Sequence, residues 1–128
     1  DSISTSNILI IDNVGMLSRL YKYADITYVG GGFGDDGVHN VLEAAVYGKP
    51  VVYGPEFEKY LEAEELIESE GGISINNALE LEKVFNELFS DYTEMKRRGK
   101  AASNYVYSKA GATQKISAHI YEKRLLTN

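Results

Sequence analysis

Short apolar runs alternate with segments of helical periodicity over residues 1–76. Continuous runs of β-branched and aliphatic residues are typical of parallel strands that are buried on both faces. Such runs predict four strands, at residues 8–11, 26–29, 51–53 and 73–75. Apolar residues at three- and four-residue spacing predict the intervening helices, at residues 16–24, 38–47 and 58–69. The alternation predicts an α/β fold, a Rossmann-like parallel sheet with flanking helices built from βαβ units with right-handed crossovers.

The rest of the chain has helical spacing and no strand-like run. Asn77 is a suitable N-cap for a helix over residues 78–89, and a second, basic helix follows it. Gly111 is expected to separate off a third helix, which continues to about residue 126. We therefore expect one domain over residues 1–128, with βαβ units over about 1–76 and a helical C-terminal tail over about 77–128.

Composition excludes several classes of protein. The formal net charge of −6 argues against a general nucleic-acid-binding protein, which usually presents a basic surface. The chain has no cysteine and two histidines, so neither a disulfide framework nor a metal site is expected. No apolar run approaches the roughly 20 residues that cross a membrane, and no signal-peptide pattern is present. We expect no cofactor.

A glycine-rich segment, Gly30 to Gly37, follows the second predicted strand and leads into the helix expected from residue 38. Glycine is favoured where the backbone takes a positive φ or approaches a ligand, and a helix start attracts anions. His39 and Asn40 precede Glu43 by four and three residues, so these polar side chains are expected to be neighbours. Apolar residues with core spacing occupy another face: Val38, Leu42, Ala45 and Val46. A helix with one packed face and one polar face is typical of a ligand site.

Three loops are expected to meet at one edge of the sheet. In doubly wound sheets, ligands bind in the loops that follow the carboxyl ends of the strands. The loops at residues 12–16, 30–40 and 54–59 each follow a predicted strand. We therefore expect these three loops to form a common site.

Motifs within residues 8–75 resemble those of the 3-deoxy-D-manno-octulosonic acid (Kdo) transferases, in the same order and at the family's spacing. The matching segments are Asp12–Leu17 with Leu20–Tyr21 and Ala24–Asp25, Val29–Gly32, His39–Ala45, and Gly48–Pro55. These GT-B glycosyltransferases transfer Kdo from CMP-Kdo to lipid A precursors during lipopolysaccharide biosynthesis in Gram-negative bacteria. The resemblance implies that this chain is the latter part of the C-terminal domain, which binds the CMP-Kdo donor.

The resemblance also implies which residues bind the nucleotide sugar. They are Gly15, Met16, Leu17 and Ser18 beside the cytidine, Gly31 and Gly32 in the glycine turn, and His39, Asn40, Val41, Leu42 and Glu43 along the nucleotide. By its chemistry, Glu43 is suited to accept hydrogen bonds from ribose hydroxyls, and Asn40 is suited to the phosphate. Two features depart from the family pattern: Ala44, where the family commonly has proline, and Asp35–Asp36, which add negative charge to the loop.

We expect the catalytic base, the groove for the lipid A acceptor and any membrane-anchoring segment to lie in an N-terminal part outside this chain. The chain therefore contains no expected catalytic residue and is expected to be inactive alone. The resemblance implies that the parent enzyme works at the cytoplasmic face of the inner membrane, with peripheral membrane association.

Two alternatives remain open. The first is a GT-B glycosyltransferase or an epimerase that uses a UDP- or GDP-sugar. The second is a non-catalytic, flavodoxin-like interaction module. Taken singly, His39 is an ordinary hydrogen-bonding residue near a helix start, Glu43 a capping residue, and Asp35 and Asp36 solubilising loop residues.

Overall fold

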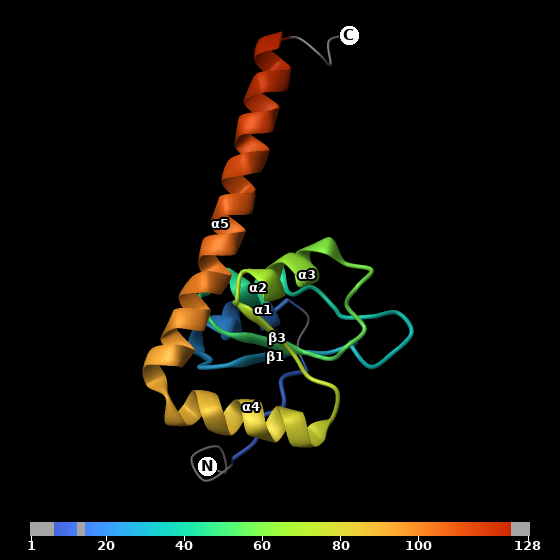
Figure 1. Cartoon of the computed structure of the whole chain (residues 1–128), viewed down its shortest axis with the longest axis vertical. Coiled ribbons are helices and arrows are strands. Elements are labelled where there is room, and N and C mark those ends of the chain that lie inside the picture. The colour runs from blue at the N-terminus through green and yellow to red at the C-terminus, as the bar shows by residue number, and fades with distance from the viewer. Residues whose placement is uncertain (1–6, 13–14, 124–128) are drawn as a thin grey trace.

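The computed structural model describes residues 7–12 and 15–123 and contains a three-stranded parallel sheet flanked by helices (Figure 1). The strands are β1 (Thr27–Val29), β2 (Val51–Tyr53) and β3 (Gly72–Ser74), in the order β1-β2-β3. Thr27 pairs with Val51, and Val51 pairs with Gly72, so both pairings are in parallel register. The helices are α1 (Leu17–Leu20), the 3₁₀ helix η2 (Tyr21–Tyr23), α2 (Leu42–Ala45), α3 (Leu61–Glu68), α4 (Ala78–Ser90) and α5 (Tyr92–Lys123). The predicted parallel α/β fold with a helical C-terminal segment is confirmed.

The core forms around the central strand β2, whose three residues are fully buried. Helices α2 and α3 lie above the sheet in Figure 1, and α4 lies below it. Ala63 and Leu66 of α3 are also fully buried, and the Tyr53 hydroxyl donates a hydrogen bond of 2.5 Å to the Ala63 carbonyl. Burial raises the pKa of Tyr53, so this phenol stays a hydrogen-bond donor at physiological pH.

The apolar run at residues 8–11 is not a strand, so this prediction was wrong. Ile8 is 81% exposed and Ile10 is 85% exposed. A strand needs a neighbouring backbone to pair with, and the described residues record no strand beside this run. The apolar pattern indicated a segment that favours burial, but it carried no information on a partner. Asn13 and Val14, in the first expected loop, lie outside the described residues.

The predicted helices in the βαβ region are shorter in the structure. The helix expected at residues 16–24 is α1 followed by η2, and the helix expected at 58–69 is α3. The helix expected at 38–47 is reduced to α2. The Asn40 side-chain oxygen accepts a hydrogen bond of 3.0 Å from the Leu42 amide, and because of this local turn the chain becomes helical only after Asn40. The C-cap of α2 is Val46, and Gly48, with φ 71°, ends the turn that follows it.

The C-terminal segment contains two helices over the described residues, not three. Asn77 caps α4 as predicted, since its side chain accepts a hydrogen bond of 2.9 Å from the Glu80 amide. α5 continues through Gly111, so the predicted break there was wrong. A glycine costs a helix only about 1 kcal/mol relative to alanine, and the neighbouring Ala110 and Ala112 favour the helix. The later half of α5 extends away from the sheet (Figure 1).

Within residues 7–12 and 15–123, no helix combines the length and the apolar character needed to cross a bilayer.

Candidate functional site at the carboxyl edge of the sheet

The loops that follow β1 and β2 are in direct backbone contact. A Cβ atom added at Gly32 would lie 2.7 Å from the Gly54 nitrogen, and one added at Gly54 would lie 2.4 Å from the Gly32 oxygen. The Glu56 amide donates to the Gly32 carbonyl at 2.9 Å, and the Val38 amide donates to the Glu56 carbonyl at 2.9 Å. Two of the three predicted loops therefore meet at this edge because glycines allow their backbones to touch.

A cavity of about 470 Å³ opens beside these loops. Its lining residues come from the loop after β1, from the start of α2 and from the start of α3: Asp36, Gly37, Val38, His39, Asn40, Leu42, Tyr60 and Glu62. Gly31 has φ +90°, and a Cβ atom there would lie 2.6 Å from the His39 ring. Glycine at this position therefore lets the imidazole lie against the turn, beside the cavity.

Asn40 and Glu43 form a polar pair on the exposed side of α2. The Asn40 side-chain amide donates to the Glu43 carboxylate at 3.2 Å, while its oxygen accepts from the Leu42 amide at 3.0 Å. Val41 and Ala44 are buried on the opposite side. Of the predicted packed face, Val38 and Ala45 are buried, whereas Leu42 lines the cavity and Val46 is half-buried.

The 3₁₀ helix η2 lies next to this polar pair. Tyr21 and Tyr47 rings have centroids 6.4 Å apart, which joins η2 to the end of α2. Burial and, secondly, the nearby Glu43 carboxylate raise the pKa of Tyr21. Tyr21 therefore lies near Glu43 but does not line the cavity.

The structure places the eleven predicted site residues in different surroundings. Leu17 and Ser18 begin α1, Met16 is its N-cap and Gly15 precedes it, and none of these four residues lines the cavity. Gly31 lies against the His39 ring and Gly32 against the Gly54 backbone, and Val41 belongs to the core. His39, Asn40 and Leu42 line the cavity, and Glu43 lies beside Asn40. The cavity-lining residues Tyr60 and Glu62 were missed, because both fall within the helix expected at residues 58–69, and helical spacing does not indicate which loop the start of that helix lies against.

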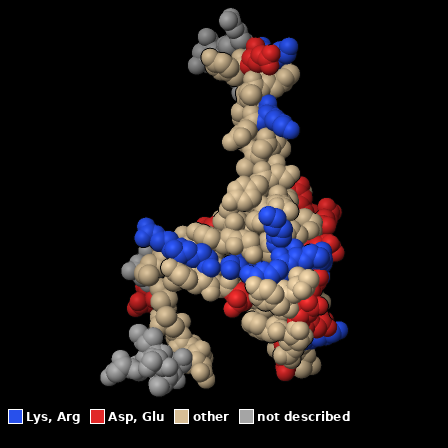
Figure 2. All heavy atoms as spheres, turned by 90° about the vertical axis from the view of Figure 1, so that its left-hand side faces the viewer, with Lys and Arg blue, Asp and Glu red and all other residues tan. Residues whose placement is uncertain are grey.

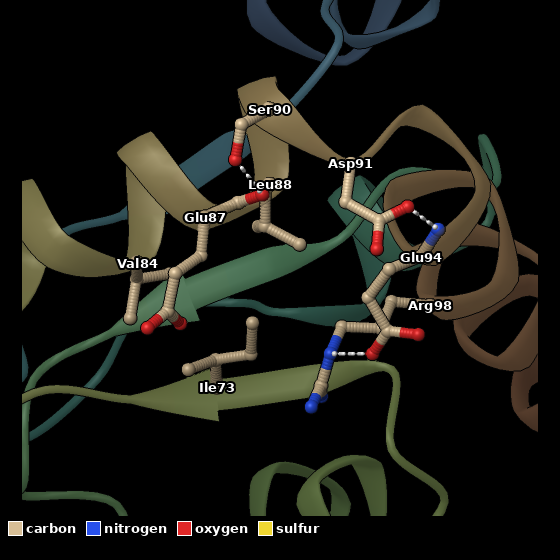
Figure 3. A pocket seen from close by; sticks show the side chains of 8 residues that line it. All are labelled: Ile73, Val84, Glu87, Leu88, Ser90, Asp91, Glu94 and Arg98. Atoms are coloured by element: carbon tan, nitrogen blue, oxygen red, sulfur yellow. Dashed lines mark hydrogen bonds and ion pairs between the residues drawn. The ribbon is translucent and has the colours of Figure 1, made fainter.

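A second cavity, of about 340 Å³, lies between β3, α4 and α5 (Figure 3). Its polar side chains bond to groups of the chain itself. The Ser90 hydroxyl donates to the Glu87 carbonyl at 3.0 Å, Asp91 accepts from the Glu94 amide at 3.0 Å, and Arg98 pairs with Glu94 at 3.0 Å. These side chains hold the α4–α5 corner together, so we do not assign a ligand to this cavity.

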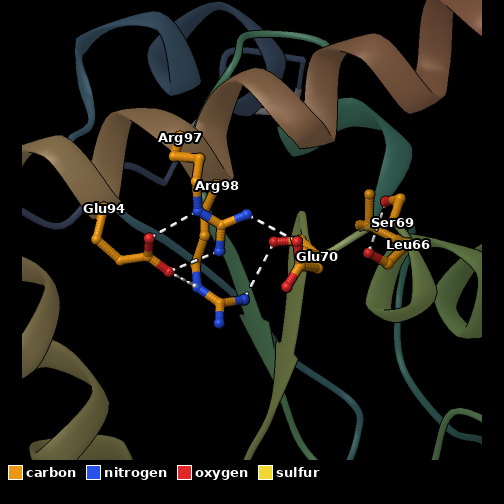
Figure 4. Close-up of polar contacts among 6 residues, drawn as sticks. All are labelled: Leu66, Ser69, Glu70, Glu94, Arg97 and Arg98. Atoms are coloured by element: carbon orange, nitrogen blue, oxygen red, sulfur yellow. Dashed lines mark hydrogen bonds and ion pairs between the residues drawn. The ribbon is translucent and has the colours of Figure 1, made fainter.

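The ion pairs continue around the amino end of β3 (Figure 4). Arg97 contacts both Glu94 and Glu70 at 2.7 Å, and Glu70 directly precedes the Gly71–Gly72 entry into β3. The Arg97 hydrogen bond, followed by the charges of Arg97 and Arg98, lowers the pKa of Glu94 to about 2. Figure 2 shows a band of Lys and Arg side chains across the body at the base of α5, with acidic side chains close to one end of it.

Among the described residues, no group of three or more His, Asp or Glu side chains has an arrangement that could hold a metal ion.

Comparison with known proteins shows the relationship that the motifs suggested. No protein-family model matches the chain. A 3-deoxy-D-manno-octulosonic acid transferase of Aquifex aeolicus is 38% identical over 91 residues, which are 70% of this chain and 26% of that protein. A Chlamydia trachomatis (serovar D) protein of the same name is 40% identical over 80 residues, covering 61% of this chain and 19% of the relative. A bifunctional glycosyltransferase/methyltransferase of Fusobacterium nucleatum is 34% identical over 95 residues, covering 70% and 15%.

The fold has a counterpart among solved structures. The C-terminal CMP-Kdo binding domain of WaaA from Acinetobacter baumannii superposes with a TM-score of 0.68 at 21% identity, covering 75% of this chain and 51% of that domain. The predicted resemblance to the Kdo transferases and to their C-terminal domain is confirmed. The chain spans about a quarter of the length of the Aquifex relative.

Proposed function

We propose that this chain is the part of a Kdo transferase that binds the donor CMP-Kdo. The sequence similarity to Kdo transferases and the shared fold with a CMP-Kdo binding domain support this assignment. The observation that carries it is the joined pair of loops at the carboxyl edge of the sheet, which presents Asn40 and Glu43 beside an open cavity. Ligands of doubly wound sheets bind at this edge.

The charges around the cavity suggest how the donor is oriented. Asp36 and Glu62 line the cavity, so a phosphate placed against them would be repelled. Carboxylates accept hydrogen bonds from hydroxyl groups, and we therefore assign Glu43 to the ribose hydroxyls. The Asn40 side-chain amide donates a hydrogen bond to Glu43, and rotation of this side chain can direct the same N–H donor toward a phosphate oxygen. The Leu42 amide, one of the free N–H groups expected at the helix start, is already bonded to Asn40.

The parent reaction is displacement at the anomeric carbon of Kdo. A hydroxyl of the lipid A precursor forms the new C–O bond, the C–O bond to the CMP phosphate breaks, and CMP leaves with the bonding pair. The hydroxyl proton passes to a base that we place outside this chain. The contribution of this chain is to hold and orient CMP, and we assign no catalytic residue to it. We place the parent enzyme at the cytoplasmic face of the inner membrane, as the resemblance to the Kdo transferases implies.

The first experiment is a titration of the chain with CMP, CDP, UMP and GMP, followed by NMR shift mapping. We expect shifts at Met16, Asn40 and Glu43 with CMP preferred, and weaker shifts in a Glu43→Gln variant. A Glu87→Gln variant, changed at an exposed residue of α4, is the matched control and should bind CMP like the wild type. Preference for UMP or GMP would transfer the assignment to another nucleotide sugar. Absence of binding by every nucleotide to the full-length parent would exclude a donor-binding role.

A further inference from the structure

The loop of residues 30–40, here called the glycine loop, is tied to the segment of residues 54–60. The Lys59 ammonium donates to the Asp35 carbonyl at 3.1 Å, and the Tyr60 hydroxyl donates to the Asp36 carbonyl at 2.5 Å. The Val38 amide donates in the opposite direction, to the Glu56 carbonyl at 2.9 Å. The conformation of the glycine loop therefore depends on the segment between β2 and α3.

Tyr60 makes a second kind of contact with the same loop. A Cβ atom added at Gly37 would lie 2.6 Å from Cε2 of the Tyr60 ring, so the ring packs directly on the glycine backbone. Gly37 has φ +82°, a conformation in which a larger residue would be strained even if space were available. Ring and hydroxyl thus hold two successive residues, Asp36 and Gly37.

The same ring forms part of the cavity wall. Tyr60 lines the cavity together with His39 and Asn40, which are separated by Val38 alone from the two residues that Tyr60 holds. A loop with five glycines, Gly30, Gly31, Gly32, Gly34 and Gly37, has a large conformational entropy to lose when it is ordered around a ligand. A tether that orders the loop beforehand raises ligand affinity, because less entropy is lost on binding.

We propose that Tyr60 is a positioning residue, which holds the glycine loop so that His39 and Asn40 stay at the cavity. The choice of CMP to measure the effect of Tyr60 on ligand affinity rests on the proposed donor-binding function. The effect on the loop itself is independent of that function, and this allows the two proposals to fail separately.

The test compares Tyr60→Phe with Tyr105→Phe in the full chain. Each variant removes one tyrosine hydroxyl with a hydrogen bond of 2.5 Å, but Tyr105 donates to Glu65, between α5 and α3. Amide hydrogen exchange is measured at Val38 and His39, whose N–H groups bond to the Glu56 and Gly30 carbonyls at 2.9 Å. We expect both amides to exchange about fivefold faster in Tyr60→Phe, the factor that corresponds to one lost hydrogen bond. Tyr105→Phe should leave both rates at the wild-type values.

Titration with CMP gives the second measurement. We expect Tyr60→Phe to weaken CMP binding by about two- to fivefold, and Tyr105→Phe to leave it unchanged. Exchange at Val38 and His39 that is unchanged by Tyr60→Phe, or that rises equally in Tyr105→Phe, would overturn the positioning role. If the wild-type full-length protein binds no CMP, the donor-binding proposal fails, and the exchange rates still decide the role of Tyr60.

Discussion

The two ends of the sheet are held together in different ways. At the carboxyl edge, Gly32 and Gly54 touch through their backbones, and main-chain amides and carbonyls join the two loops. At the amino end of β3, charged side chains make the connections, with Arg97 and Arg98 bridging Glu94 to the residues before the strand (Figure 4).

This difference distinguishes the end of the sheet whose side chains hold the fold together from the end whose side chains face a cavity. Where the backbone carries the contacts, polar side chains such as His39 and Asn40 remain exposed beside a cavity. Where side chains carry the contacts, Glu94 is bonded by two guanidinium groups. We therefore expect the carboxyl edge to be sensitive to added volume, and the amino end to be sensitive to pH.

The largest effect is expected from Gly54→Ala. The new methyl group would lie within 2.4 Å of the Gly32 oxygen and 2.6 Å of its carbonyl carbon, and backbone atoms cannot move aside as a flexible side chain can. Overpacking of this kind costs about 3 kcal/mol of unfolding free energy. Urea denaturation followed by circular dichroism measures it, and the loss of contact should also weaken nucleotide binding.

Gly34→Ala is the matched control for Gly54→Ala. Its methyl group would meet only the Gly31 oxygen at 3.6 Å, an ordinary contact in an exposed part of the same loop. The unfolding free energy should change by less than about 0.5 kcal/mol. Equal stability losses in the two variants would show that the backbone contact between the loops is not what holds this edge together.

Two asparagines whose side chains accept a backbone hydrogen bond at the start of a helix provide a comparison of intermediate size. Asn77 begins the thirteen-residue α4 and is backed by Glu80, whose carboxylate accepts from the Asn76 amide at 2.7 Å. Asn77→Ala should therefore cost about 1 kcal/mol of unfolding free energy and leave CMP binding unchanged. Asn40 precedes Val41, the N-cap of the four-residue α2, and α2 is fixed mainly by burial of Ala44 and Ala45.

Asn40→Ala should show the opposite pattern. We expect a stability loss of about 0.5 kcal/mol, at the low end for a lost hydrogen bond, and CMP binding that is weaker by at least about fivefold. Denaturation and the CMP titration, applied to both variants, measure the two effects. A loss of CMP affinity in Asn77→Ala that matched the loss in Asn40→Ala would mean that binding reports general stability rather than a contact at the site.

The sequence predicted those elements whose surroundings lie close by in the chain. β2 was predicted residue for residue, because its apolar run is bounded by Pro50 and Gly54. Residues 8–11 have an equally apolar pattern, but pairing depends on a neighbour that local pattern does not describe. The end of a helix at Gly111 was also wrong, because one glycine weakens a helix without stopping it.

In the candidate site, too, contacts between residues close in the sequence could be predicted and contacts between distant residues could not. Asn40 and Glu43 could be paired from their spacing alone, and the structure places them in contact. Tyr60 lies 24 residues after Asp36, whose carbonyl it holds, and no periodicity connects positions so far apart. The wall of the cavity therefore could not be predicted, since it depends on how the two loops pack in three dimensions.

The smallest expected effect is a loss of unfolding free energy at low pH, and it tests the amino end of β3. Arg97 and Arg98 lower the pKa of Glu94 to about 2, whereas an unfolded chain leaves a glutamate near its usual value of about 4.3. The folded state therefore binds this proton less readily than the unfolded state does. The stability that Glu94 contributes is fully present above about pH 4.3 and is lost as the pH falls toward 2.

Replacing Glu94 by glutamine removes this pH-dependent contribution. The urea midpoint of the wild type should exceed that of Glu94→Gln at pH 6, and the difference should shrink between about pH 4 and pH 2. Glu87→Gln is the control, because the Glu87 carboxylate forms an exposed ion pair of 3.8 Å with Lys83, and this variant should follow the wild type across the range. A difference between wild type and Glu94→Gln that stayed constant from pH 6 to pH 2 would mean that shape, not charge, holds α5 at the amino end of β3. The two ends of the sheet would then depend on packing alike.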